Sequence, residues 1–201
     1  MRPNYAQDAP PTSIEVGGTA YPCNVDYRVW LDVHRKLRDL ILEPSTPEQD
    51  LHNAELCDDI QMLVFGGILA DEHPADVLHG IFEFAAGYPS APTQSPPGDE
   101  APTFSFEYDL NEIIIAIRNQ SGIDLSYRRT EPFHWWEFLL EFRTLCGDHY
   151  ILNLIEIRGY KGKDKEMLAR KRRCALPVEH TAEEQALLDS IDAEFDGKSK
   201  E

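Results

Sequence analysis

The sequence predicts a mainly α-helical protein, with a helical bundle-like body and a short N-terminal β-hairpin. Several segments carry apolar residues at the three- and four-residue spacing of a buried helix face. Proline or glycine marks the breaks between these segments, and one short alternating stretch surrounds Gly17-Gly18. The chain has 201 residues, of which 42% are hydrophobic and 27% charged, so it can build a sizeable core.

Composition divides the chain into five segments. Residues 1–13 are proline-rich and are expected to be a flexible lead-in. Residues 14–87 are predicted to form the hairpin and a helical lobe, and residues 104–178 a second helical lobe with a basic stretch. Between them, residues 88–103 hold five of the 14 prolines and are expected to be a linker or a long surface loop with nothing to pack. Residues 179–201 form an acidic tail with a weak apolar stripe that allows a short helix. The sequence leaves open whether the two lobes form one body.

The first predicted elements are the hairpin and three helices. Glycine takes the positive φ values of a tight turn, which places the turn of the hairpin at Gly17-Gly18. Asp26 can cap the first helix, and Pro74 is well placed in the first turn of the third. The expected helices run from Asp26 to before Pro44 and Pro47, over about residues 52–65, and from Pro74 to Gly87.

Two or three more helices are predicted after the proline-rich stretch. The first has Leu110, Ile113 and Ile117 on its inner face and ends at Gly122. The next is opened by Pro132 and stopped by Gly147. Residues 150–157 form either a helix or a buried strand, and the neighbouring helices favour a helix.

The charge of the chain limits its partners. It has 36 acidic and 19 basic residues and a net charge of −17, which argues against nucleic acid and anionic membranes as partners. Eight of the basic residues lie between residues 158 and 173. There, Arg170, Lys171, Arg172 and Arg173 either bind phosphate or belong to a charged helix that pairs with the acidic tail or the protein body. We favour the second interpretation. A third interpretation, in which the protein is a DNA-contacting factor, is based on this stretch alone.

No chemistry-bearing motif is present, so we assign no catalytic, metal-binding or cofactor-binding residues and expect no enzyme. His73 and His79 are more simply explained as a helix-start residue and an exposed residue than as a metal site. The four cysteines lie far apart, which favours a reduced, intracellular protein with the thiols as small core residues. No apolar run is long enough to span a membrane, and no secretory signal is present.

The stretch Phe133-His134-Trp135-Trp136 is the most unusual local feature. Adjacent residues on a helix point about 100° apart, so one tryptophan can fill a core while the other reaches a second surface. The simpler alternative is that both are buried between helices. The other is an exposed aromatic anchor for a partner, because interface hot spots favour tryptophan.

Five short stretches, taken in order, resemble a bacteriophage protein family. The family is the one named after gene product fifteen, found in tailed phages and prophages of Gram-positive hosts. The resemblance extends from residue 14 to about residue 175, and its most specific part is His-Trp-Trp-x-Phe. The stretches are Val25–Leu31, Phe104–Asp109, Gly122–Leu125, His134–Phe138 and Ile155–Arg158.

The resemblance implies a non-enzymatic tail-module protein without cofactors. Members are encoded just before the tape-measure gene, the position of tail assembly chaperones in many long-tailed phages. Such chaperones are small, mostly helical, acidic and absent from the finished virion. The implied role is to keep the tape measure protein soluble in the host bacterial cytoplasm until tail tube protein polymerises around it. The alternative is a structural virion component, such as a head–tail connector or tail completion protein, assembled as a ring.

A chaperone of this kind needs a surface that covers apolar stripes of its partner. We expect the aromatic residues Trp30, His134, Trp135, Trp136 and Phe138 to lie near that surface. The sequence does not give the oligomeric state.

Overall fold

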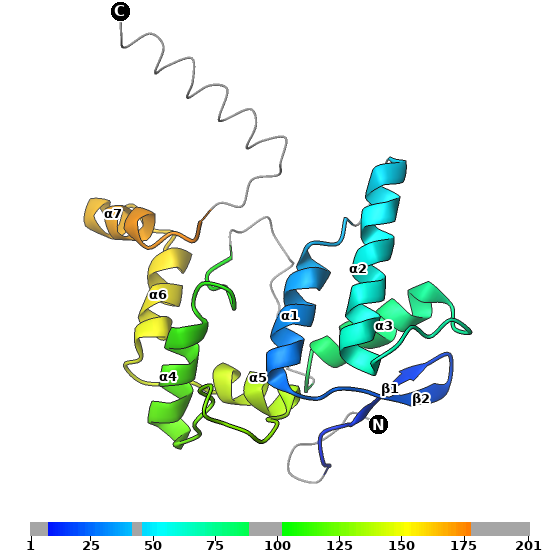
Figure 1. Ribbon diagram of the computed structural model, residues 1–201. Coiled ribbons are helices and arrows are strands. Elements are labelled where there is room, and N and C mark those ends of the chain that lie inside the picture. The colour runs from blue at the N-terminus through cyan, green and yellow to red at the C-terminus, as the bar shows by residue number, and fades with distance from the viewer. Residues whose placement is uncertain (1–7, 42–45, 89–101, 178–201) are drawn as a thin grey trace, which may run out of the picture.

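The computed structural model describes residues 8–41, 46–88 and 102–177, and over these residues the mainly α-helical class is confirmed (Figure 1). An antiparallel hairpin is followed by helices that pack around a shared apolar core. The elements are β1 Ser13–Val16, β2 Thr19–Pro22, α1 Tyr27–Arg38, α2 Pro47–Phe65, α3 Pro74–Ala85, α4 Leu110–Ser121, α5 Trp135–Arg143, α6 Tyr150–Gly159 and α7 Lys165–Arg173.

The hairpin turns where the sequence predicts it. Gly17 and Gly18 have φ values of 56° and 86°, which L-residues with side chains adopt poorly. Ile14 and Val16 are buried, and the hairpin packs on α3 at Gly80. A Cβ atom at Gly80 would lie 2.9 Å from the carbonyl oxygen of Glu15 and as close to the Ile14 side chain, so the missing side chain makes room for the strand.

Local capping explains where the helices begin. Asp26 caps α1 as predicted, since its carboxylate accepts from the backbone N–H of Arg28 at 3.0 Å. Helix α2 begins at Pro47, earlier than predicted, because Thr46 caps it and a proline is favoured in a first turn. Pro47 therefore starts α2 instead of ending α1. Helix α5 begins at Trp135 and not at Pro132, because His134 is its N-cap.

The predicted ends of the other elements are largely confirmed. Gly66 and Gly122 cap α2 and α4 in the left-handed conformation. Residues 150–157 are helical, within α6. Tyr88, expected in the linker, is instead buried against Trp136, with ring centroids 4.9 Å apart. The remaining predictions for the lead-in, the linker and the acidic tail concern residues that lie mainly outside the described ranges.

The two predicted lobes share one core. A backbone bridge joins the starts of α1 and α5: Tyr27 N–H donates to Phe133 C=O at 2.8 Å, and Trp135 N–H donates to Val25 C=O at 2.7 Å. In the helices that follow this bridge, the indole rings of Trp30 and Trp135 stack with their centroids 6.3 Å apart. Of the two alternatives left open by the sequence, the structure has the single packed body.

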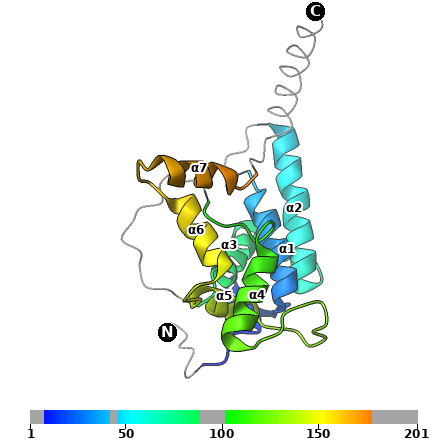
Figure 2. The ribbon, with the colours of Figure 1, turned by 90° about the vertical axis from the view of Figure 1, so that its left-hand side faces the viewer.

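The C-terminal helices lie on one side of this body. Helix α4 packs against both α5 and α6, and α7 lies across the end of α6 (Figure 2). The connection from residue 102 to residue 109 runs between α1 on one side and the α6–α7 pair on the other. This placement creates the groove described below.

The shared core gives a stability prediction. Trp135 is fully buried, and its indole N–H donates to the Ala85 carbonyl at 2.9 Å. Trp135→Ala should lower the free energy of unfolding by about 3–5 kcal/mol in urea denaturation, because it opens a large cavity. Tyr127, which is 87% exposed, provides the control: Tyr127→Ala should change stability by less than about 0.5 kcal/mol. Equal effects of the two substitutions would contradict the buried stack.

Candidate partner-binding groove

The aromatic residues expected to contact a partner are core residues. Trp30, Trp135 and Phe138 have no exposed surface, and His134 and Trp136 are 8% and 7% exposed. Each indole N–H donates to a backbone carbonyl, at 2.6 to 2.9 Å. The alternative in which both adjacent tryptophans are buried is therefore the one observed. In this conformation none of the five offers a ring to a partner, and partner contact by them stays a prediction.

His134 has a structural role instead. Its Nδ1 accepts the backbone N–H of Trp136 at 3.0 Å, and its Nε2 lies 2.8 Å from the carbonyl oxygen of Pro11. Both contacts are satisfied by a neutral ring with the proton on Nε2. Burial lowers the pKa of His134 below its usual value of 6.5, although the Pro11 carbonyl and the Glu137 carboxylate act in the opposite direction. The residue caps α5 and ties the N-terminal strand region to it.

The basic stretch does not act as one patch. Arg170, Arg172 and Arg173 are exposed on α7, whereas Lys171 is half-buried and donates from Nζ to the Tyr160 carbonyl at 2.9 Å. Arg158 belongs to the interior. The choice between phosphate binding and pairing with the acidic tail or the protein body stays open, because the tail lies outside the described residues.

Arg158 joins three parts of the fold. Its guanidinium pairs with Asp109 through two contacts, Nη1–Oδ2 at 2.6 Å and Nη2–Oδ1 at 3.0 Å. It also donates to the carbonyls of Thr103 at 3.2 Å and Cys174 at 2.6 Å. The two charged side chains are only 10% and 4% exposed. The pair therefore fixes the 103–109 connection to α6 and to the end of α7.

This pair supports a groove of about 1100 Å³. Its apolar part contains Leu31 of α1, Leu110 at the start of α4 and the rings of Phe104, Phe106 and Tyr108. Phe106 stacks edge-on against His34, with centroids 5.2 Å apart. Tyr108 is 45% exposed and accessible to a ligand. The volume exceeds the roughly 300–1,000 Å³ of small-molecule pockets and suits a polypeptide segment.

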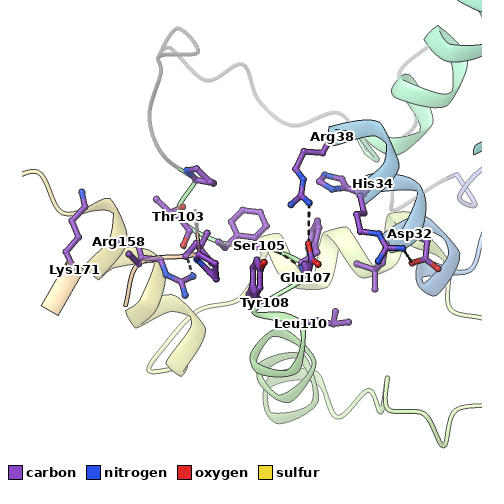
Figure 3. Close-up of a pocket in the computed structure, with 18 residues that line it drawn as sticks. Asp32, His34, Arg38, Thr103, Ser105, Glu107, Tyr108, Leu110, Arg158 and Lys171 are labelled. Atoms are coloured by element: carbon purple, nitrogen blue, oxygen red, sulfur yellow. Dashed lines mark hydrogen bonds and ion pairs between the residues drawn. The ribbon is translucent and has the colours of Figure 1, made fainter. Parts of the chain in front are cut away.

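Cationic side chains stand on both sides of the groove (Figure 3). Arg35 and Arg38 come from the last turn of α1, and Lys171 from α7 opposite. Arg35 lies 3.3 Å from Asp32, and Arg38 lies 3.3 Å from Glu107 and 3.6 Å from Asp39, so carboxylates partly balance the rim. The lining thus has four cationic side chains, Arg35, Arg38, Arg158 and Lys171, and two anionic ones, Asp32 and Glu107.

The sequence interpretation missed the groove. Its parts come from three segments separated by about fifty residues or more, and no local pattern links them. The signal that was available lies in the resemblance, because the stretches Phe104–Asp109 and Ile155–Arg158 both belong to it. They contribute the two charged partners of the buried ion pair.

The histidines and cysteines of the described residues do not line the groove, with the exception of His34. Among the described residues, no three His, Cys, Asp or Glu side chains gather in a way that could hold a metal ion. His73 caps α3 and His79 is exposed beside Glu83, as the simpler interpretation predicted.

Burial raises the pKa of the Cys23 thiol to about 12. Cys146 is exposed and Cys57 and Cys174 are only partly buried, so the expectation that the thiols are core residues is wrong for Cys146. Of the four cysteines, Cys23 packs against the core, where it is partly buried. In the described part of the chain, no helix combines the length and apolarity needed to cross a membrane.

Comparison with known families identifies the region that carries most of the groove. Residues 85–176 match the family model described as Bacteriophage Gp15 protein. Over these residues the chain is similar to the Gp15 family. The match confirms the resemblance from residue 85 onward and includes Asp109, Arg158 and Lys171; the α1 wall lies outside it. No curated protein and no solved structure matches the chain.

The buried ion pair gives a second stability prediction. Arg158→Met should cost about 3–5 kcal/mol of unfolding free energy, because it leaves the Asp109 carboxylate buried and unpaired. Adding Asp109→Asn should recover part of this loss in a double-mutant cycle followed by chemical denaturation. The pair Lys36–Asp59, whose side chains are 24% and 62% exposed, is the control, and Asp59→Asn should cost less than about 1 kcal/mol. Equal losses for the two pairs would contradict the role of Arg158.

The lowered pKa of His134 predicts that the stability of the folded protein depends on pH. Its folded-state pKa is lowered, so below about pH 6.5 the unfolded state binds more protons and the folded state loses stability as the pH falls. His134→Asn keeps an N-cap acceptor but does not titrate. Thermal unfolding of both proteins between about pH 7.5 and pH 5.5 should show a larger loss for the wild type. Parallel curves would show that His134 does not contribute to the pH dependence.

Proposed function

We propose that this protein is a non-enzymatic tail assembly chaperone that binds the tape measure protein in the host cytoplasm. The match of residues 85–176 to the Gp15 family model supports a role as a phage structural or morphogenesis protein. The observation that carries the finer proposal is the groove between α1, residues 102–110 and the α6–α7 pair. Its size, aromatic lining and accessible Tyr108 suit an apolar polypeptide segment.

The physical need for such a groove follows from the partner. A tape measure is a long helical chain with apolar stripes that self-associate until the tail tube covers them. A helix placed in an aromatic groove buries one such stripe at a time. The strong net negative charge of the chaperone then keeps the complexes apart in solution.

The cationic rim adds selectivity for the kind of segment bound. Arg35, Arg38 and Lys171 surround the apolar floor, and Arg35 and Arg38 already have acidic neighbours. A segment that carries acidic residues beside its apolar stripe fits this arrangement better than a basic one, because opposite charges face each other across the rim.

Co-expression tests the proposal. The tape measure protein of the same phage should be insoluble alone and soluble in a stoichiometric complex with this protein. Tyr108→Ala should weaken capture in a pull-down by about tenfold, the effect expected for an aromatic contact worth about 1.4 kcal/mol. Tyr127→Ala changes an exposed tyrosine outside the groove and should leave capture unchanged.

Two results would contradict the proposal. The first is equal capture by both tyrosine variants, which would move the contact away from the groove. The second is detection of the protein in purified virions as a closed ring, which would favour a structural connector or tail completion component. Thermal unfolding of each variant must match the wild type, so that a folding defect is not read as lost binding.

A further inference from the structure

The end of the described chain lies in the groove itself. After α7, Ala175, Leu176 and Pro177 all line the groove. The residue directly before them is anchored, because Arg158 Nε donates to the Cys174 carbonyl at 2.6 Å. The residues that follow therefore start from the groove wall and not from a distant surface. Any segment attached here is tethered beside the aromatic floor.

The composition of the tethered segment complements the groove. Residues 178–201 contain eight acidic residues and two lysines, so the segment is strongly negative. They also contain apolar residues, of which Leu187, Ile191 and Phe195 are the largest set at four-residue spacing. The groove offers an aromatic floor and a rim on which the cationic Arg35, Arg38 and Lys171 outnumber the carboxylates of Asp32 and Glu107.

Tethering makes even weak complementarity effective. Attachment through a short connection gives a segment an effective concentration on the order of millimolar. An intrinsic dissociation constant of about 0.1 mM would then keep the groove about nine-tenths filled. At about 3.3 Å per residue the segment is long enough to reach across the groove from Pro177.

We infer that residues 178–201 occupy the groove in the free protein and act as an intramolecular competitor of its partner. The inference deepens the proposed function, on which its regulatory meaning rests. A partner must displace the acidic segment, so the groove is covered until a segment of higher affinity arrives. Nine-tenths occupancy would weaken the apparent affinity for the partner about tenfold.

Hydrogen–deuterium exchange of the full-length chain tests occupancy without any partner. The groove amides of residues 103–108 and of the last turn of α1 should exchange several-fold faster when the tail is altered, because an occupant protects them. The variants remove either apolar or acidic side chains and keep the length. The apolar set is L187S, I191S and F195S, and the acidic set is D189N, D192N and E194Q.

A matched variant controls for changes anywhere in the tail. Replacing Lys198 and Lys200 by serine removes charges of the opposite sign and should leave groove exchange as slow as in the wild type. Identical exchange in the wild type and both altered tails would overturn the inference. Protection that disappears on dilution would also overturn it, because the occupant would then be the tail of a second copy.

A binding experiment separates this inference from the proposed function. The apolar tail variant should bind the tape measure protein about tenfold more tightly than the wild type, since its groove is empty. Slow groove exchange that depends on the tail, with no tape measure binding by any variant, supports the tail contact and contradicts the proposed function. Tape measure binding that depends on Tyr108 and ignores the tail, with unchanged exchange, supports the function and overturns the tail contact.

Discussion

The ion pair between Asp109 and Arg158 is the interaction on which the groove depends. One guanidinium holds the carboxylate of Asp109, the carbonyl of Thr103 and the carbonyl of Cys174. Without it, three separate stretches of chain would have no common support. A carboxylate and a guanidinium removed from water are costly unless their hydrogen bonds are satisfied, and here the planar fork satisfies several at once. The interaction fixes the shape of the site and does not itself need to touch a ligand.

The buried aromatic residues stabilise the core, whereas the groove is the candidate binding surface. Trp30, Trp135 and Phe138 join the two halves of the chain into one core and give α1 a fixed position. Because α1 is fixed, its last turn presents Arg35 and Arg38 to the connection at residues 103–108. The most distinctive stretch, His-Trp-Trp-x-Phe, thus belongs to the core that holds α1 in place. The less distinctive Phe104–Asp109 stretch forms part of the groove itself.

This division explains which inferences from sequence succeed. Capping by Asp26, the glycine turn of the hairpin and the left-handed ends at Gly66 and Gly122 are local, so neighbouring residues predict them. The start of α5 was missed because His134 caps it through a side chain held by Pro11, more than a hundred residues away in sequence. The spacing of apolar residues along a helix does not predict such a long-range contact.

The sequence by itself determined the helical class, the positions of most helices, the acidic character and the resemblance to the Gp15 family. Each of these depends on composition or on residues within a few turns of one another. Only the tertiary structure decided that both adjacent tryptophans are buried, that Arg158 pairs with Asp109 in the interior, and that Pro177 lines a groove. These outcomes depend on which segments meet in space, and burial of a charge or a ring is settled by its partners across the core and not by its neighbours along the chain.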